Sequence, residues 1–263
     1  MAHTVRCGAP QRCLLVQAAF LGIDLAWSAR NASGLAALTL DRQTGRAYLT
    51  EPPSYLRTDA EILAFVARYA HHTPLIVAID APLCVPNTAG KRLGDALISK
   101  AFAKYGAGAH PANRTLLGKY NSGVLRGEWL IAGFAALDIQ HTPHFEAQQA
   151  VRCAFEAYPH AAMVGLFRLP RALRYKRKQG LSKAAQESAW QTYAAQLRTL
   201  GQAVPPLDLP DDLLDGAWRK AEEDKRDALL CAYIALHYWW HAAAFWQVYG
   251  TLAEGYIVAP RLG

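Results

Sequence analysis

Short apolar runs separated by polar turns characterise the N-terminal part of the chain. Residues 19–27 and 33–40 are largely apolar, and residues 47–50 return to a strand-like composition. Between the second and third runs, residues 41–45 read Asp-Arg-Gln-Thr-Gly, which supplies typical turn chemistry. The pattern predicts three strands connected as a meander.

A helix is predicted next, beginning near residue 58. Thr58 and Glu61 have the spacing of a capping box, in which each side chain bonds the backbone of the other residue. Apolar positions then recur with the helical period, at Ile62, Phe65, Val66 and Tyr69. One face of this helix is therefore expected to be buried.

A fourth strand and a basic segment follow. Residues 75–80 are a continuous apolar run ending in Asp80, which is typical of a strand covered on both faces in a parallel region. Residues 83–126 are rich in loops and in basic side chains, with one helix expected at about 93–105. A further helix is expected at 128–138.

The C-terminal half contains one more sheet strand and two longer helices. Residues 151–158 are predicted as the fifth strand, and Ser182 as the cap of a helix. Residues 205–210 are interpreted as a linker. A long helix is expected at about 224–241, and a short final strand at 256–258.

This order of elements predicts one α/β domain: a mixed five-stranded sheet flanked by helices, with a helical, basic insertion at about 83–126 after the fourth strand. Residues 1–17 are interpreted as an N-terminal extension. They are not expected to be a signal peptide, because the apolar stretch 14–23 runs directly into Asp24 without a small-residue cleavage pattern.

Charge is unevenly distributed along the chain. The net charge is +7, yet residues 91–126 carry seven basic residues against Asp95 alone, and residues 168–183 carry seven basic residues and no acid. The remaining residues are therefore net acidic. A basic excess confined to two segments indicates a polyanionic partner such as DNA or RNA. The alternative is ordinary solvated surface charge.

Cysteine usage and hydropathy bear on location. The five cysteines are odd in number, widely spaced and without a CxxC motif, which argues against a disulfide framework or a zinc ribbon. No apolar run approaches the roughly 18 residues of a membrane span. The sequence therefore predicts a cytoplasmic protein with free thiols and no membrane partner; it does not indicate an oligomeric state.

Several acids lie in apolar surroundings. Asp24 lies within the first strand, Asp80 ends the fourth, and Glu156 lies in the fifth. A carboxylate in a buried strand is costly unless it is paired, hydrogen-bonded or bound to metal. Asp224 and Asp227 share one face at the start of the last long helix. These acids predict a shared site, the alternative being local pairing of each acid with an arginine or a loop.

Carboxylate oxygens are the ligands that Mg²⁺ and Mn²⁺ prefer. Two such ions about 4 Å apart activate water and stabilise the leaving oxygen when a phosphodiester is cleaved. The acidic set is thus of the kind that metal-dependent phosphodiester hydrolysis requires.

The order of elements, with acids on the first strand, the fourth strand and the last helix, resembles the RNase H-like superfamily. The pair Asp224 and Asp227 is similar to the acids of its Holliday-junction resolvase branch. The chain is more specifically similar to domain-of-unknown-function family 429 (DUF429), whose members are described as predicted RNase H-like nucleases. The matching segments are Gly22-Ile-Asp24, Ile79-Asp-Ala-Pro82, Arg92 with Asp95, Phe155-Glu-Ala-Tyr-Pro159, Tyr175-Lys176, Asp224-x-x-Asp-Ala228, and Glu254-Gly-Tyr-Ile257 before Pro260.

The resemblance implies an RNase H-like fold and a two-metal nuclease with Mg²⁺ or Mn²⁺ as cofactor. By that resemblance and the carboxylate chemistry together, Asp24 would bridge the metals, and Asp80 and Asp227 would complete the coordination. Glu156 would belong to the catalytic set and Asp224 to the metal ligands. Either residue could act directly or by supporting a residue that binds the metal.

The substrate side of the site is predicted from the basic residues. Arg92, Arg114 and Lys176 are expected to contact phosphates, and Tyr175 offers a stacking surface. Plain surface charge is the alternative for Arg114 and Lys176.

Two other functions fit the same residues. One is a non-catalytic nucleic-acid-binding module that keeps the fold. The other is an actin-like phosphotransferase, which also begins with a Gly-x-Asp strand. That class generally needs two such domains, and the 263-residue chain shows no second Gly-x-Asp strand followed by a phosphate loop.

Overall fold

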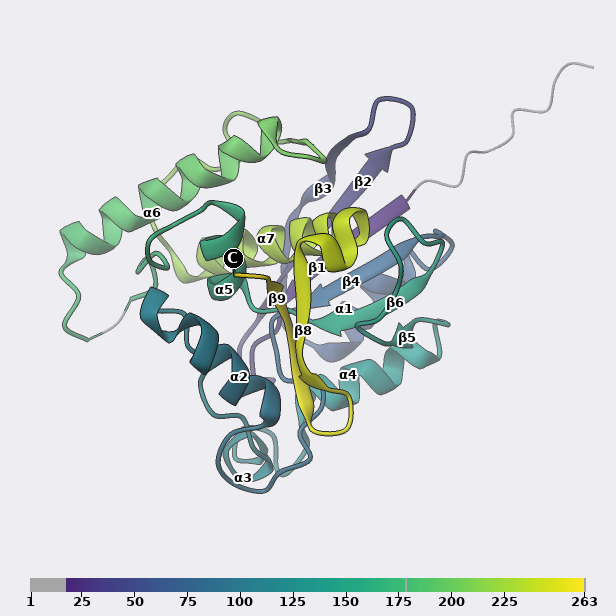
Figure 1. Cartoon of the computed structure of the whole chain (residues 1–263), viewed down its shortest axis with the longest axis vertical. Coiled ribbons are helices and arrows are strands. Elements are labelled where there is room, and N and C mark those ends of the chain that lie inside the picture. The colour runs from purple at the N-terminus through teal and green to yellow at the C-terminus, as the bar shows by residue number, and fades with distance from the viewer. Residues whose placement is uncertain (1–17, 178, 263) are drawn as a thin grey trace, which may run out of the picture.

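The computed structural model describes residues 18–177 and 179–262 (Figure 1). The predicted N-terminal extension, including Cys7 and Cys13, lies outside the described residues. None of the helices in the described ranges combines the length and the apolarity that crossing a membrane requires.

A mixed sheet of seven strands, in the order β5-β6-β4-β1-β2-β3-β7, forms the centre of the fold (Figure 1). Strands β1, β2 and β3 pair antiparallel, whereas β4 pairs parallel with both β1 and β6. The strands are β1 (Ala18–Asp24), β2 (Ser33–Asp41), β3 (Arg46–Leu56), β4 (Leu75–Ile79), β5 (Gln140–His141), β6 (Arg152–Glu156) and β7 (Leu207–Asp208).

The prediction of five strands is therefore corrected to seven. The five expected strands are present, and the two additional ones, β5 and β7, contain two residues each and pair parallel at the sheet edges. Strand β7 lies within the segment interpreted as a linker. Two-residue strands leave no periodic pattern, because alternation needs several residues to become visible.

Two layers of helices cover the sheet. Helix α7 (Lys220–His241) lies on one face, and α1 (Asp59–Ala67) and α4 (Arg126–Ala135) lie on the other. Strand β1 shows this division, because Ala18 and Phe20 pack in the α7 layer while Ala19 and Leu21 pack in the α1 layer. Both faces of β1 and β4 are buried, as the apolar runs predicted.

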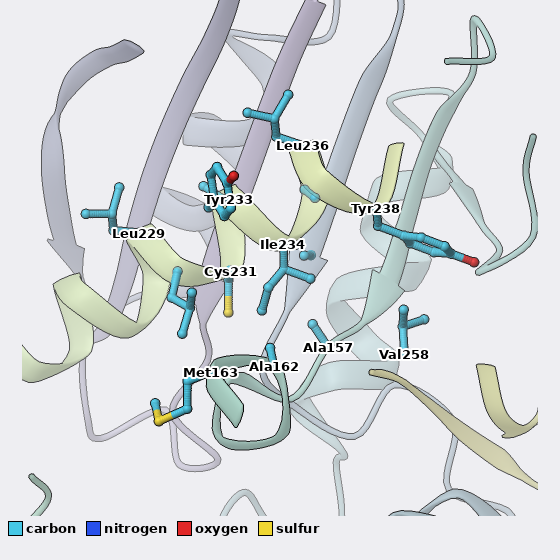
Figure 2. Close-up of a cluster of buried hydrophobic side chains, with 14 of the residues drawn as sticks. Ala157, Ala162, Met163, Leu229, Cys231, Tyr233, Ile234, Leu236, Tyr238 and Val258 are labelled. Atoms are coloured by element: carbon cyan, nitrogen blue, oxygen red, sulfur yellow. The ribbon is translucent and has the colours of Figure 1, made fainter. Parts of the chain in front are cut away.

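The α7 layer is completed by segments that lie far away in sequence. Figure 2 shows Tyr233, Ile234 and Leu236 of α7 above Ala162 and Met163 of α5 (Pro159–Leu166). Strands β8 (Trp246–Thr251) and β9 (Gly255–Pro260) form a separate antiparallel hairpin. The remaining helices are α2 (Leu93–Phe102), α3 (Arg114–Gly118), α6 (Lys183–Arg198) and the 3-10 segments η1 (Ala103–Tyr105), η2 (Thr199–Gln202) and η3 (Ala242–Ala244).

Local signals fix several element starts. Thr58 and Glu61 form the predicted capping box, and Ser182 caps α6 through the Ala185 amide. Pro159, which follows the predicted fifth strand, begins α5, where its fixed φ suits the first helical position. Helix α7 begins at Lys220 rather than at 224.

Close contact between α7 and the sheet depends on two glycines. A Cβ atom built on Gly22 would collide with the backbone of Ala228 and Ala232, and one built on Gly34 would collide with the backbone of Asp224. Only glycine allows such an approach. The same contact brings the acidic start of α7 to the end of β1.

Candidate acidic site at the ends of β1 and β4

Asp24 and Asp80 are neighbours at the carboxyl ends of two parallel strands. Ile23 pairs with Ile79 in the β1–β4 register, and the Asp80 amide donates to the Ile23 carbonyl at 2.8 Å. Both aspartates are half-buried. Within the described part of the chain, no side-chain hydrogen bond or ion pair is formed by either carboxylate. The two acids therefore form an adjacent pair whose oxygens remain open to a ligand.

The electrostatics of this pair favour the neutral acids. Burial raises the pKa of Asp24 well above its ordinary value, and Asp227, Asp80 and Asp224 raise it further, while Lys176 opposes the shift. Burial likewise raises the pKa of Asp80 to about 7, again with Asp227 adding to the shift and Lys176 opposing it. Holding both carboxylates ionised is thus costly unless a cation comes to them.

Asp227 lies beside the pair and is contacted by two tyrosines and a lysine. Its Oδ1 accepts from the Tyr175 hydroxyl at 2.6 Å and the Tyr193 hydroxyl at 3.1 Å, and its Oδ2 lies 2.8 Å from Lys176 Nζ. Burial alone would raise the pKa of Asp227, but the Lys176 ammonium, His160 and these hydrogen bonds lower it. Asp227 is therefore the ionised member of the cluster.

Lys176 supplies the positive charge at the centre of the acids. Although burial would lower its pKa, Asp227, Asp24 and Asp80 together raise it, so the side chain is an ammonium. A quarter of the side chain is exposed. It faces a cavity of about 200 Å³ that is also lined by His160, Arg171 and Arg174. An anion entering this cavity would meet the cations Arg171, Arg174 and Lys176.

Tyr175, predicted as a stacking surface, is wholly buried and stacks on Tyr193 with ring centroids 4.5 Å apart. Its hydroxyl is bound to Asp227. A buried ring cannot receive a base, so the stacking role is corrected: Tyr175 orients Asp227. Its neighbour Lys176 contacts the other oxygen of the same carboxylate.

Glu156 belongs to a different, buried ion cluster. Its Oε1 lies 2.6 Å from Arg92 Nη2, and its Oε2 accepts from Arg92 Nη1 at 2.8 Å and from the Leu83 amide at 2.9 Å. Arg92 also bonds Asp95 at 2.7 Å and is 2% exposed. The prediction that Arg92 contacts phosphate is therefore corrected, because its guanidinium is consumed internally. Glu156 remains close enough to Asp80 to raise its pKa.

The other two predicted residues have protein partners as well. Arg114 is an exposed residue whose Nη2 pairs with Glu128 at 2.9 Å. Asp224 is 5% exposed, and its Oδ1 lies 2.5 Å from Lys220 Nζ. Asp224 and Lys220 line one cavity together with Asp24. Asp224 is thus beside the acid pair, whereas Arg114 belongs to the surface of the insertion.

The donor set fits one hard cation better than two. Among the described residues, no group of three or more His, Cys, Asp and Glu side chains is arranged to hold a metal ion. Asp24 and Asp80 present carboxylates without side-chain partners in the described part of the chain, and Mg²⁺ is commonly bound by one or two carboxylates plus water. A second ion would need Asp227, whose oxygens are held by Lys176, Tyr175 and Tyr193.

Sequence reasoning missed the residues that surround this pair. Trp27, Tyr55 and Lys220 line the cavity beside Asp24, and Tyr193 holds Asp227. The closeness of Trp27 to Asp24 in sequence was a usable signal. The roles of Tyr55 and Tyr193 depend on tertiary contacts that no local pattern encodes.

Asp80→Asn is expected to stabilise the fold by about 1–3 kcal/mol at pH 8. The pKa of Asp80 rises on folding from its ordinary value of 3.8 to about 7, so the folded protein binds the proton more tightly than the unfolded chain. Stability is therefore lost as pH rises through that window, and an amide avoids the loss. Urea unfolding at pH 8 and pH 4 measures the effect.

The gain should be much smaller at pH 4, which is close to the ordinary pKa of 3.8, because most of the loss develops only as pH rises from there toward 7. Asp215→Asn is the matched control, because Asp215 is exposed and pairs with Arg198 at the surface. An equal gain at both pH values would contradict the charge argument and indicate a simple packing effect.

A protein-family model matches most of the chain. The model of the family described as "Protein of unknown function (DUF429)" matches residues 22–246, a range that includes Asp24, Asp80, Lys176 and Asp227 but not the segment from Glu254 to Pro260. No curated protein and no solved structure matches the chain. Because the family model covers most of its length, the chain belongs to the DUF429 family.

Proposed function

We propose that this protein is a divalent-metal-dependent phosphodiesterase with an RNase H-like arrangement, acting on nucleic acid. The observation that carries the proposal is the Asp24–Asp80 pair. Two adjacent carboxylates at parallel strand ends, without side-chain hydrogen bonds and with raised pKa values, are an electrostatic cost that a cation-binding function would explain. Cation binding at this pair removes the cost.

Different residues of the chain would bind the metal, position the lysine and bind the phosphate. Asp24 and Asp80 would hold one Mg²⁺ or Mn²⁺ ion, which on binding supplies Lewis-acid stabilisation and an activated water. Asp227, held by Tyr175 and Tyr193, fixes the Lys176 ammonium beside the pair. Lys176 is placed to bind a phosphate oxygen, since it is partly exposed and borders a basic cavity.

The two-metal form of the mechanism requires one change in this arrangement. Lys176 would have to leave Asp227 so that Oδ2 becomes a ligand. A phosphate group that binds Lys176 offers the ammonium a replacement partner. We therefore propose one ion in the free protein, with any second ion arriving together with substrate.

The test is cleavage of labelled single-stranded DNA and RNA by the purified chain at pH 8 with Mn²⁺ or Mg²⁺, against the same reaction in EDTA. Cleavage is expected with metal only. It should fall by about tenfold per pH unit below pH 7, because the Asp80 carboxyl, with a pKa of about 7, must lose its proton to bind metal. Absence of cleavage on every strand with both metals would contradict the proposal.

A non-catalytic nucleic-acid-binding module is the second candidate. It is favoured by the position of Lys176, whose ammonium already offsets part of the charge of the three acids. Calorimetry with Mn²⁺ at pH 8 separates the two: binding that is lost in Asp80→Asn supports the enzyme, and no binding supports the module. Nucleic acid as partner and a cytoplasmic location remain predictions in both cases.

A further inference from the structure

We infer that the cavity beside Asp24 is a stacking site for an unpaired nucleobase, so that the substrate is a single-stranded nucleic acid or a single-stranded region. This inference rests on the proposed function and names the substrate of the same site. The cavity measures about 450 Å³ and includes Asp24 and Asp224 in its wall. That volume is within the usual range of small-ligand sites.

Three aromatic rings from separate segments line this cavity: Trp27 after β1, Tyr55 at the end of β3 and Tyr120 after α3. Tyr55 is 38% exposed and Tyr120 is 44% exposed. The rings of Trp27 and Tyr120 are 6.2 Å apart and tilted by 60°. Rings that gather in one concave site offer π faces to a flat ligand, and every nucleobase has such a face.

The aromatic wall is held rigidly. Arg126 is 4% exposed and donates to the carbonyls of Ala26 at 2.7 Å and Arg57 at 3.0 Å, which joins two walls of the cavity. The Asn121 side chain accepts from the Ala29 amide at 2.8 Å and donates to the Trp27 carbonyl at 2.7 Å. A site fixed before binding loses less conformational entropy when a ligand enters.

Charge around the cavity suits a phosphate-linked ligand. The exposed residues Arg30, Arg57 and Lys220 lie in the same wall as the two acids. Lys220 is positioned by Glu223 and Asp224. Phosphates flanking a stacked base would meet these cations, whereas an uncharged ligand such as a sugar would leave them unused.

Trp27 connects the stacking site to the acid pair. Besides this cavity, it lines a second one of about 80 Å³ that contains Asp80. A base on Trp27 would therefore lie beside the acid pair, with its phosphodiester toward the proposed metal position. In a duplex both faces of each base are covered by its neighbours, so only an unpaired base can stack here.

The test measures binding without cleavage, in EDTA and at low fixed salt, by fluorescence anisotropy. The probes are a labelled oligothymidylate, an abasic strand of equal length and charge, and the corresponding duplex. The wild-type protein should bind the base-bearing strand about 5- to 100-fold more tightly than the abasic strand. Equal affinity for the two strands, or tighter binding of the duplex, would overturn the inference.

Substitutions of the lining aromatic residues test which side chains cause the preference for the base-bearing strand. Trp27→Leu and Tyr120→Ala should each remove most of the preference for the base-bearing strand. Because Trp27 also packs on a small apolar cluster, Tyr120→Ala provides the variant that leaves that cluster intact. Trp129→Ala is the matched control, since Trp129 is 45% exposed on α4 and should leave the preference unchanged.

The outcome is independent of the cleavage test. Base-dependent binding without metal-dependent cleavage would support the stacking site and contradict the proposed enzyme. Metal-dependent cleavage of abasic and base-bearing strands at equal rates, with equal affinities, would support the proposed enzyme and contradict the stacking site.

Discussion

Replacing Arg92 with methionine should lower the free energy of unfolding by about 3–5 kcal/mol. The Arg92 side chain is 1% exposed and bonds both Glu156 and Asp95, with a further bond to the Cys84 carbonyl at 3.0 Å. Without the guanidinium, two carboxylates face each other in a buried space. Urea unfolding followed by far-ultraviolet circular dichroism at pH 7 measures the loss.

The loss should be smaller near pH 4. Burial raises the pKa of Glu156, and Arg92 opposes that shift, so its removal lets the carboxyl take up a proton more easily. Arg114→Met is the matched control, because the Arg114–Glu128 pair is exposed and is expected to contribute less than about 1 kcal/mol. A loss in Arg92→Met no larger than that of the control would show that the cluster does not stabilise the fold.

This cluster changes the meaning of the basic insertion. Arg92, Arg114 and Arg126 contribute to the basic excess of residues 91–126, yet each pairs with an acid of the same chain: Arg92 with Glu156 and Asp95, Arg114 with Glu128, and Arg126 with Asp59. Part of the basic excess is therefore used in ion pairs within the chain. The second basic segment differs, because Arg171, Arg174 and Lys176 line one cavity next to the acids.

The acids could be predicted from the sequence because strand ends follow simple rules. Asp24 and Asp80 each end an apolar run, and parallel neighbours bring such ends together. Asp227 could be predicted because the amphipathic start of α7 had to meet the sheet. Gly22 allows α7 to approach β1 closely, but this role can be recognised only when α7 is known to cross β1.

Other parts of the site depend on contacts that local sequence does not encode. Lys176 lies in a loop between α5 and α6, and nothing in its neighbours indicates that it enters the acid cluster. Tyr175 resembles an exposed aromatic beside a basic residue, yet it is buried by α6. The ion partners of Arg92 are 3 and 64 residues away, a separation that no periodic pattern reveals.

Asp24→Asn should reduce metal-dependent cleavage by about 10³-fold or more, because a metal contributes several kcal/mol of transition-state stabilisation and each 1.4 kcal/mol is about tenfold in rate. An amide has nearly the shape of the carboxylate but lacks its charge and binds divalent ions weakly. Single-turnover cleavage at pH 8 with saturating Mn²⁺ measures the rate, and Asp215→Asn should retain wild-type activity.

The same substitution should raise the melting temperature at pH 8, which separates loss of function from loss of fold. Burial, Asp227, Asp80 and Asp224 all raise the pKa of Asp24, so the ionised carboxylate weakens the fold above its ordinary pKa, and an amide relieves that cost. Lower activity with higher stability is the signature of a residue kept for function. Lower activity with lower stability would instead assign Asp24 a structural role and remove the main support for the metal site.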